Sequence, residues 1–115
     1  MTSSVDVFQE IQNVIDSNAV VLFMKGTPDM PQCGFSSFVC QVLKKLDVSF
    51  VGINVLASAE LRQGIKDFTN WPTIPQLYIK GVFVGGADIV RDMYQAGELQ
   101  DLLAGHGLLV TQEAV

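Results

Sequence analysis

The sequence predicts an α/β domain in which helices flank a four-stranded mixed sheet. Its clearest strand is Val20–Met24, which is apolar without alternation and therefore suits a strand covered on both faces. The segments before and after this strand carry apolar residues at helical spacing. A strand, a crossover helix and a second strand indicate a right-handed parallel pair, and two short apolar runs around Gly81 indicate a tight hairpin. The two kinds of pairing together make the predicted sheet mixed.

The first helix is predicted to begin at Ser3 or Ser4, because either side chain can cap a helix N-terminus. Phe8, Ile11 and Ile15 repeat at positions i, i+3 and i+7, so we expect them to form one buried stripe. The pattern stops before residue 20, where the first strand begins.

The second helix is predicted to begin near Cys33 and to run to about Leu46. Residues 49–55 then indicate a second strand, and Ser58 can cap a third helix. The apolar stripe of that third helix consists of Leu61, Ile65 and Phe68. The first five elements therefore alternate between helix and strand, which favours the parallel pair.

The last third of the chain is predicted to form strands at 76–80 and 82–84, followed by one helix that opens at Gly85 and Gly86. Apolar residues at Ile89, Val90, Met93, Tyr94, Leu99, Leu102 and Leu103 are expected to close the core. No sustained period continues past Gly105. We therefore expect one domain over residues 1–104 and a loosely attached tail over 105–115.

Composition indicates a single soluble domain. The chain has 115 residues, of which 49% are hydrophobic, and this is enough for one core. Its longest apolar runs are far shorter than the roughly 20 residues that span a bilayer, and no signal or transit peptide is visible. The net charge of -5 argues against nucleic-acid binding, which depends on clustered cations. We expect a reducing compartment, the cytoplasm first, with the mitochondrial matrix as the alternative.

Cys33 is the candidate reactive residue. It lies where a turn-rich loop meets the second helix, and a thiol at a helix N-terminus feels unpaired N–H groups and the positive end of the dipole. Its pKa should therefore fall, and Lys25 adds a positive charge after the strand. A buried structural cysteine is the alternative. The position of Cys33 between Pro31 and Gly34 favours a working thiol.

The second cysteine, Cys40, is not expected to pair with Cys33. Seven residues of helix rise roughly 10 Å, which is too far for the Cα separation of a disulfide. Cys40 lies beside the apolar stripe of its helix, so we expect a small buried core residue.

Four short motifs together carry a family resemblance. They are Lys-Gly-Thr-Pro at 25–28, Cys-Gly-Phe-Ser at 33–36, Trp-Pro-Thr-Ile-Pro-Gln at 71–76 and Gly-Gly-Ala-Asp-Ile at 85–89. Each motif alone is weak, but four in this order are specific. Over about residues 8 to 104 the chain resembles a monothiol glutaredoxin of the CGFS type. The resemblance implies a thioredoxin-like (glutaredoxin) fold.

The resemblance also implies a glutathione site. In glutaredoxins the second proline of the Trp-Pro-Thr-Ile-Pro motif is cis, and the residue before it, here Ile74, offers its backbone to glutathione. Asp88, beside a glycine turn that can hold a carboxylate, is assigned to the γ-glutamyl end. Lys25 and Arg62 are assigned to the glycine end. Without the resemblance these segments would be a plain turn, a helix N-terminus and an exposed helix residue.

Two further site positions follow from the same resemblance. Phe35 is expected to shield the Cys33 sulfur. The second is Ala87, where the family often has cysteine or serine. Because alanine has no thiol, no disulfide can form between this position and Cys33. Ser36 likewise places a hydroxyl where a resolving thiol would stand in Cys-x-x-Cys. An activated Cys33 is left with two uses, which are attack on a glutathionyl mixed disulfide and donation of a thiolate to a soft metal centre.

The leading functional hypothesis is an iron–sulfur carrier. Two chains and two glutathiones would supply four thiolates to one [2Fe-2S] cluster, for transfer to acceptor proteins in iron–sulfur protein assembly and iron homeostasis. The chain should then be a homodimer when cluster-bound and a monomer when apo, and the resemblance suggests BolA-type partners. The alternative is a glutathione-dependent oxidoreductase that removes glutathione from protein thiols, with Cys33 as the catalytic residue. A redox-inert interaction domain is the third hypothesis.

Overall fold

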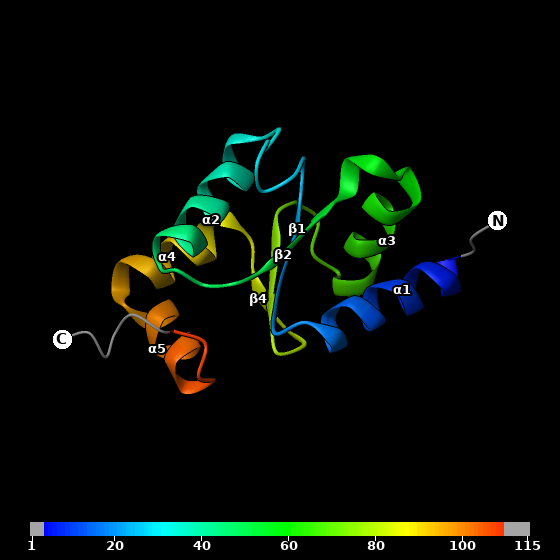
Figure 1. The fold of residues 1–115 in the computed structure, drawn as a ribbon. Coiled ribbons are helices and arrows are strands. Elements are labelled where there is room, and N and C mark those ends of the chain that lie inside the picture. Colours follow the sequence, from blue (N-terminus) through cyan, green and yellow to red (C-terminus); the bar gives the residue numbers. More distant parts are fainter. Residues whose placement is uncertain (1–3, 110–115) are drawn as a thin grey trace.

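The structure is a computed structural model and describes residues 4–109. Its elements are α1 Ser4–Ser17, β1 Val20–Met24, α2 Gly34–Lys45, β2 Val51–Asn54, a short 3-10 helix η1 Val55–Ala57, α3 Ala59–Thr69, β3 Gln76–Ile79, β4 Val82–Gly85, α4 Ala87–Ala96 and α5 Glu98–Gly105. Figure 1 shows the helices in two groups, one on each side of the sheet. No helix within the described range is long and apolar enough to cross a membrane.

The sheet has the strand order β2-β1-β3-β4. Strand β1 pairs in parallel with β2, so that Met24 lies opposite Asn54, and it pairs antiparallel with β3. The β3–β4 hairpin turns through Lys80 and Gly81, whose φ angles of 52° and 79° suit a tight two-residue turn. The predicted four-stranded mixed sheet flanked by helices is therefore confirmed.

Two apolar cores cover the two faces of the sheet. Helices α2, α4 and α5 pack on one face, where Leu22 and Met24 of β1 point, and helices α1 and α3 pack on the other, where Val21 and Phe23 point. Every residue of β1 is buried, as its unbroken apolar run predicts. Because β1 and β2 are parallel, both strands end at the same edge of the sheet. The loop that carries Cys33 begins at this edge (Figure 1).

The expected buried stripe of α1 is wrong at one position. Phe8 is 37% exposed and packs edge-on against Phe68, with ring centroids 5.6 Å apart. Val7 takes its place in the core with Ile11 and Ile15. Any side chain at Gly64 of α3 would collide with Val7, so this glycine lets the two helices approach closely and fixes which face of α1 is buried. Ser3, the other candidate cap, lies outside the described residues.

The single last helix expected from the sequence is two helices. Gly97 separates α4 from α5 and has a φ of 79°, in the left-handed region that ends an α-helix. After α5, the N–H of Leu108 donates to the carbonyl of Leu103 at 2.9 Å, and Leu108 and Leu109 pack partly against the core. The remainder of the expected tail, 110–115, lies outside the described residues.

Two smaller differences affect the site. The strand expected over 49–55 is limited to the four residues of β2, and η1 follows it directly. The side chain of Asn54 causes this change of direction, because its Oδ1 accepts the N–H of Leu56 at 2.9 Å and caps η1.

Candidate functional site

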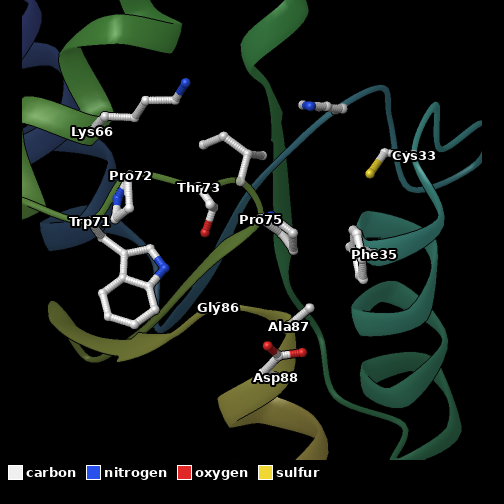
Figure 2. Close-up of a pocket in the computed structure, with 12 residues that line it drawn as sticks. Cys33, Phe35, Lys66, Trp71, Pro72, Thr73, Pro75, Gly86, Ala87 and Asp88 are labelled. Atoms are coloured by element: carbon white, nitrogen blue, oxygen red, sulfur yellow. The ribbon is translucent and has the colours of Figure 1, made fainter.

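Cys33 caps the N-terminus of α2. Its backbone is extended, with φ -151° and ψ 137°, and its carbonyl accepts the N–H of Ser37 at 2.8 Å. The side chain is partly exposed, and Figure 2 shows its sulfur facing a groove. The helix forms here because two prolines and Gly26 stop regular structure before residue 33, after which apolar residues recur at helical spacing.

The surroundings of Cys33 favour its thiolate. The backbone N–H of Ser36 is the largest cause that lowers the pKa of Cys33, and the backbone N–H of Phe35, the charge of Lys25 and the Ser36 hydroxyl act in the same direction. Partial burial opposes them but does not reverse the shift. The expected lowering is therefore confirmed in direction, and backbone N–H groups of the first helical turn are its largest cause.

Cys40 has the opposite environment. It is buried in the core, and its Sγ lies 3.6 Å from Sδ of Met24. Burial raises the pKa of the Cys40 thiol, which keeps it protonated and unreactive. Both thiols are free, so Cys33 has no disulfide partner within the chain.

Hydrogen bonds fix the loop that precedes Cys33. The buried Ser36 hydroxyl accepts the N–H of Lys25 at 3.1 Å, which joins the end of β1 to the first turn of α2. Gly26 has a φ of 91°, and a Cβ there would lie 2.5 Å from the carbonyl oxygen of Met30. Asn54 Oδ1 accepts the N–H of Gly26 at 2.9 Å. The backbone of Lys25 and Gly26 is therefore fixed by hydrogen bonds to Ser36 and Asn54, and this positions the Lys25 side chain beside the site.

The opposite wall of the groove is the segment 71–75. The bond between Ile74 and Pro75 is cis, as the resemblance implies, and Ile74 is buried. The N–H of Trp71 donates to Oγ1 of Thr69 at 3.1 Å, and the indole ring lies 5.6 Å from the Phe83 ring, centroid to centroid. Figure 2 shows Thr73 and Pro75 across the groove from Cys33 and Phe35.

The third wall is the glycine turn that opens α4. Gly86 is the N-cap, and a Cβ there would lie 3.0 Å from Nε1 of Trp71 and 3.3 Å from the carbonyl oxygen of Pro75. Asp88 lies in the first turn of α4, where a carboxylate interacts favourably with the helix dipole. Its exposed side chain also pairs with Arg91 at 3.5 Å.

These walls enclose one groove of about 440 Å³. Its twelve lining residues are Lys25, Cys33, Phe35, Lys66, Trp71, Pro72, Thr73, Ile74, Pro75, Gly86, Ala87 and Asp88 (Figure 2). Six of the seven residues singled out in the sequence thus lie around one cavity, although they come from four separate segments. Arg62 does not line it.

Comparison with known proteins agrees with this architecture. The sequence profile of the family Glutaredoxin matches residues 20–84, from the start of β1 into β4. This chain belongs to the glutaredoxin family. The match includes the Cys33 loop and the cis-proline segment, so the resemblance inferred from the four motifs is confirmed.

Relatives of this glutaredoxin carry the monothiol name. One is the uncharacterized monothiol glutaredoxin ycf64-like of Synechocystis sp., 56% identical over 93 residues that cover 81% of this chain and 87% of that protein. Another is the mitochondrial monothiol glutaredoxin-5 of Lachancea kluyveri, 51% identical over 113 residues that cover 96% and 79%. The relatives thus include a cyanobacterial protein and a mitochondrial one. The crystal structure of a buckwheat glutaredoxin–glutathione complex shares the fold, with a TM-score of 0.81 at 24% identity, covering 93% of this chain and 96% of that one.

One cation in the glutaredoxin groove was missed by sequence reasoning. Lys66 of α3 lines the groove, whereas Arg62 lines an adjoining hollow that Lys66 also borders. The two residues are one helical turn apart, so the i, i+4 spacing could have identified Lys66 once Arg62 was considered. Lys66 is one turn closer than Arg62 to the end of α3, after which the chain continues into the segment 71–75.

The lowered pKa leads to a pH-dependent prediction. The rate of Cys33 alkylation by iodoacetamide should reach half its maximum at a lower pH than for the same chain in denaturant. Because folding favours the thiolate, Cys33 ionisation stabilises the native state above the unfolded pKa, and this contribution is lost as pH falls through the folded pKa. Lys25→Met should remove only part of the shift, because backbone N–H groups supply its largest cause. A native Cys33 rate profile identical to the denatured one would contradict the prediction.

Proposed function

We propose that this glutaredoxin binds glutathione beside Cys33 and that two chains together carry a [2Fe-2S] cluster as cargo for acceptor proteins. The observation that carries the proposal is the single accessible thiol with a lowered pKa, which faces a groove without a second thiol. A lone thiolate suits exchange with glutathione or ligation of a soft metal ion, and it does not suit dithiol chemistry.

The charges of the groove match those of glutathione. Figure 2 shows Lys66 and Asp88 at different ends, with the cis-proline segment between them. Glutathione carries a carboxylate at its glycine end and an ammonium with a second carboxylate at its γ-glutamyl end. Lys66 and Lys25 can attract the glycine carboxylate, and Asp88 can accept from the ammonium. The free N–H groups at the start of α4 can hold the remaining carboxylate, and Ile74 can pair its backbone with the peptide.

The cargo follows from the number of available donors. A [2Fe-2S] cluster takes four thiolates, and within residues 4–109 no three His, Cys, Asp or Glu side chains gather as metal ligands. Cys33 of each chain would supply two thiolates, and the sulfur of each bound glutathione would supply the others. The exposed ring of Phe35 beside Cys33 can shield the sulfurs from water. Acceptor proteins of iron–sulfur assembly, and BolA-type proteins as the resemblance suggests, are the partners we propose.

The alternative function uses the same groove. In deglutathionylation the Cys33 thiolate attacks the glutathione sulfur of a mixed disulfide, forms a new disulfide with it and releases the protein thiolate. Free glutathione then attacks this disulfide, restores the Cys33 thiolate and leaves as oxidised glutathione. The partly exposed sulfur and its lowered pKa favour this reaction as well. A second cysteine is not required.

One experiment separates the two functions. The protein is purified without oxygen in the presence of glutathione, and its visible spectrum, iron and acid-labile sulfide are measured. A brown protein with about one iron and one sulfide per chain supports the carrier. A colourless protein that rapidly reduces a glutathionyl mixed disulfide supports the oxidoreductase and contradicts the carrier.

The placement of glutathione predicts an order of mutational effects. Lys66→Ala and Asp88→Ala should each weaken glutathione binding by on the order of 1 kcal/mol, because each removes one charge-assisted contact in a partly exposed site. Arg62→Ala should have a smaller effect, since Arg62 lines the adjoining hollow. Titration calorimetry measures all three. Unchanged affinity in both Lys66→Ala and Asp88→Ala would show that the tripeptide is placed wrongly.

A further inference from the structure

Gln76 is a fully buried polar residue at the start of β3. The other residues of this strand are Leu77, Tyr78 and Ile79, and all of them are buried. Burying an amide stabilises a fold poorly unless its polar atoms are paired, so a glutamine at this position calls for a specific role.

The amide of Gln76 bonds back to the segment that precedes it. Its Nε2 donates to the carbonyl oxygen of Trp71 at 3.1 Å and to that of Thr73 at 3.3 Å. Both amide protons are thereby used. Oε1 has no partner among the described residues. The opposite orientation of the amide would bring Oε1 against two carbonyl oxygens, so the observed orientation is fixed by repulsion as well as by attraction.

The segment that Gln76 holds forms much of the groove. Residues 71–75 supply five of the twelve lining residues, while Gln76 itself does not line the groove (Figure 2). At its first residue the segment is held by Trp71, which bonds to Thr69 and packs on Phe83, and the apolar side chain of Ile74 packs in the core. The bond from Gln76 to Thr73 fixes a polar group of the backbone at the middle of the segment, next to Ile74.

We propose that Gln76 is a positioning residue for the glutathione site, which rests on the function proposed above. By tying the carbonyls of Trp71 and Thr73 to the buried start of β3, it holds the backbone of Ile74 across the groove from Cys33. It acts through this backbone and makes no contact with the tripeptide. The buried amide thus serves the geometry of the loop.

The variant Gln76→Met tests this role, because methionine has nearly the same length and no amide protons. We expect a folded protein whose dissociation constant for reduced glutathione rises about tenfold, from two lost hydrogen bonds. Trp71 is the only tryptophan in the chain, so its fluorescence reports the segment directly. When both proteins are measured in the absence of glutathione, the emission maximum of the variant should lie at longer wavelength than that of the wild type, because the indole becomes hydrated.

Gln100→Met is the matched control. Gln100 is partly buried in α5, its Nε2 donates to the carbonyl oxygen of Tyr94 at 3.4 Å, and its Oε1 also lacks a partner within the described chain. It does not line the groove. This variant should keep both the glutathione affinity and the Trp71 emission of the wild type. An equal loss in Gln100→Met would overturn the proposal, because the effect would then be general.

A second variant guards against a folding failure. Gln76→Asn keeps a buried amide but is one methylene shorter, so it can reach at most one of the two carbonyls and should lose affinity in the same direction. Wild-type affinity and emission in a folded Gln76→Met or Gln76→Asn variant would overturn the positioning role. If the wild type itself does not bind glutathione, the proposed function fails, and the Trp71 emission of the variants still decides whether Gln76 holds the segment.

Discussion

The Cys33→Ser variant should purify without iron or acid-labile sulfide under conditions that load the wild type. A serine hydroxyl stays protonated at neutral pH and is a poor ligand for the soft iron–sulfur centre, so the loss should be complete. The groove should otherwise be preserved, because Cys33 is partly exposed and a serine of similar size can also cap α2. Iron and sulfide quantitation with the visible spectrum measures the loss, and glutathione affinity shows that the site is still folded.

Cys40→Ser is the control for this experiment. It should keep the cluster, because Cys40 is buried against Met24 and takes no part in the groove. Placing a hydroxyl in apolar packing should lower the free energy of unfolding by about 1 to 3 kcal/mol. An intact cluster in Cys33→Ser would remove the central claim, whereas a lost cluster in a folded Cys40→Ser would assign Cys40 a role that its burial does not suggest.

The second large effect is on assembly. The protein should be a monomer without cluster and a dimer with it, with one glutathione per chain, because each chain offers one thiolate and the cluster takes four. Among the described residues close in sequence to Cys33, the exposed large apolar side chains are Phe35 and Met30, 63% and 68% exposed. We expect these few side chains to bury too little area for a stable dimer, so in the proposed assembly the cluster and its glutathiones supply the link. Mass-resolved chromatography with iron and glutathione quantitation measures both states.

Withdrawing glutathione or oxidising the cluster should return the dimer to monomers. A loaded monomer, or a loaded dimer that contains no glutathione, would show that other ligands complete the site. Cys40 would then be the first residue to reconsider, since it is the only other cysteine in the chain.

The sequence predicted correctly those parts of the fold that depend on residues close together in the chain. The unbroken apolar run of β1, the helix that begins after Cys33 and the hairpin through Gly81 each depend on a few neighbouring residues. The cysteine environment could be predicted for the same reason, because the N–H groups that lower its pKa belong to Phe35 and Ser36, two and three residues further along the chain.

The predictions failed where the position of a side chain depends on segments that are distant in the sequence. Whether Val7 or Phe8 of α1 is buried depends on how closely α3 can approach, and Gly64 sets that distance from 57 residues further along the chain. Likewise, the choice between Arg62 and Lys66 depends on where α3 lies relative to the segment 71–75. No local period encodes either arrangement. The helix end at Gly97 could be predicted only in part. Glycine is favoured at helix ends, but a glycine in the sequence does not by itself require that a helix end there.

Strand β1 lies inside the sheet, with a partner on each side and all its side chains buried. Its amide protons should therefore exchange with solvent only when the whole domain opens, whereas those of the loop at 26–32 can exchange by a local opening. Cys33 therefore follows a loop whose hydrogen bonds are mostly local, and this loop is attached directly to the buried strand. For the proposed carrier, such a local opening would release the cluster at a cost far below that of unfolding, while the strand that anchors the loop stays fixed.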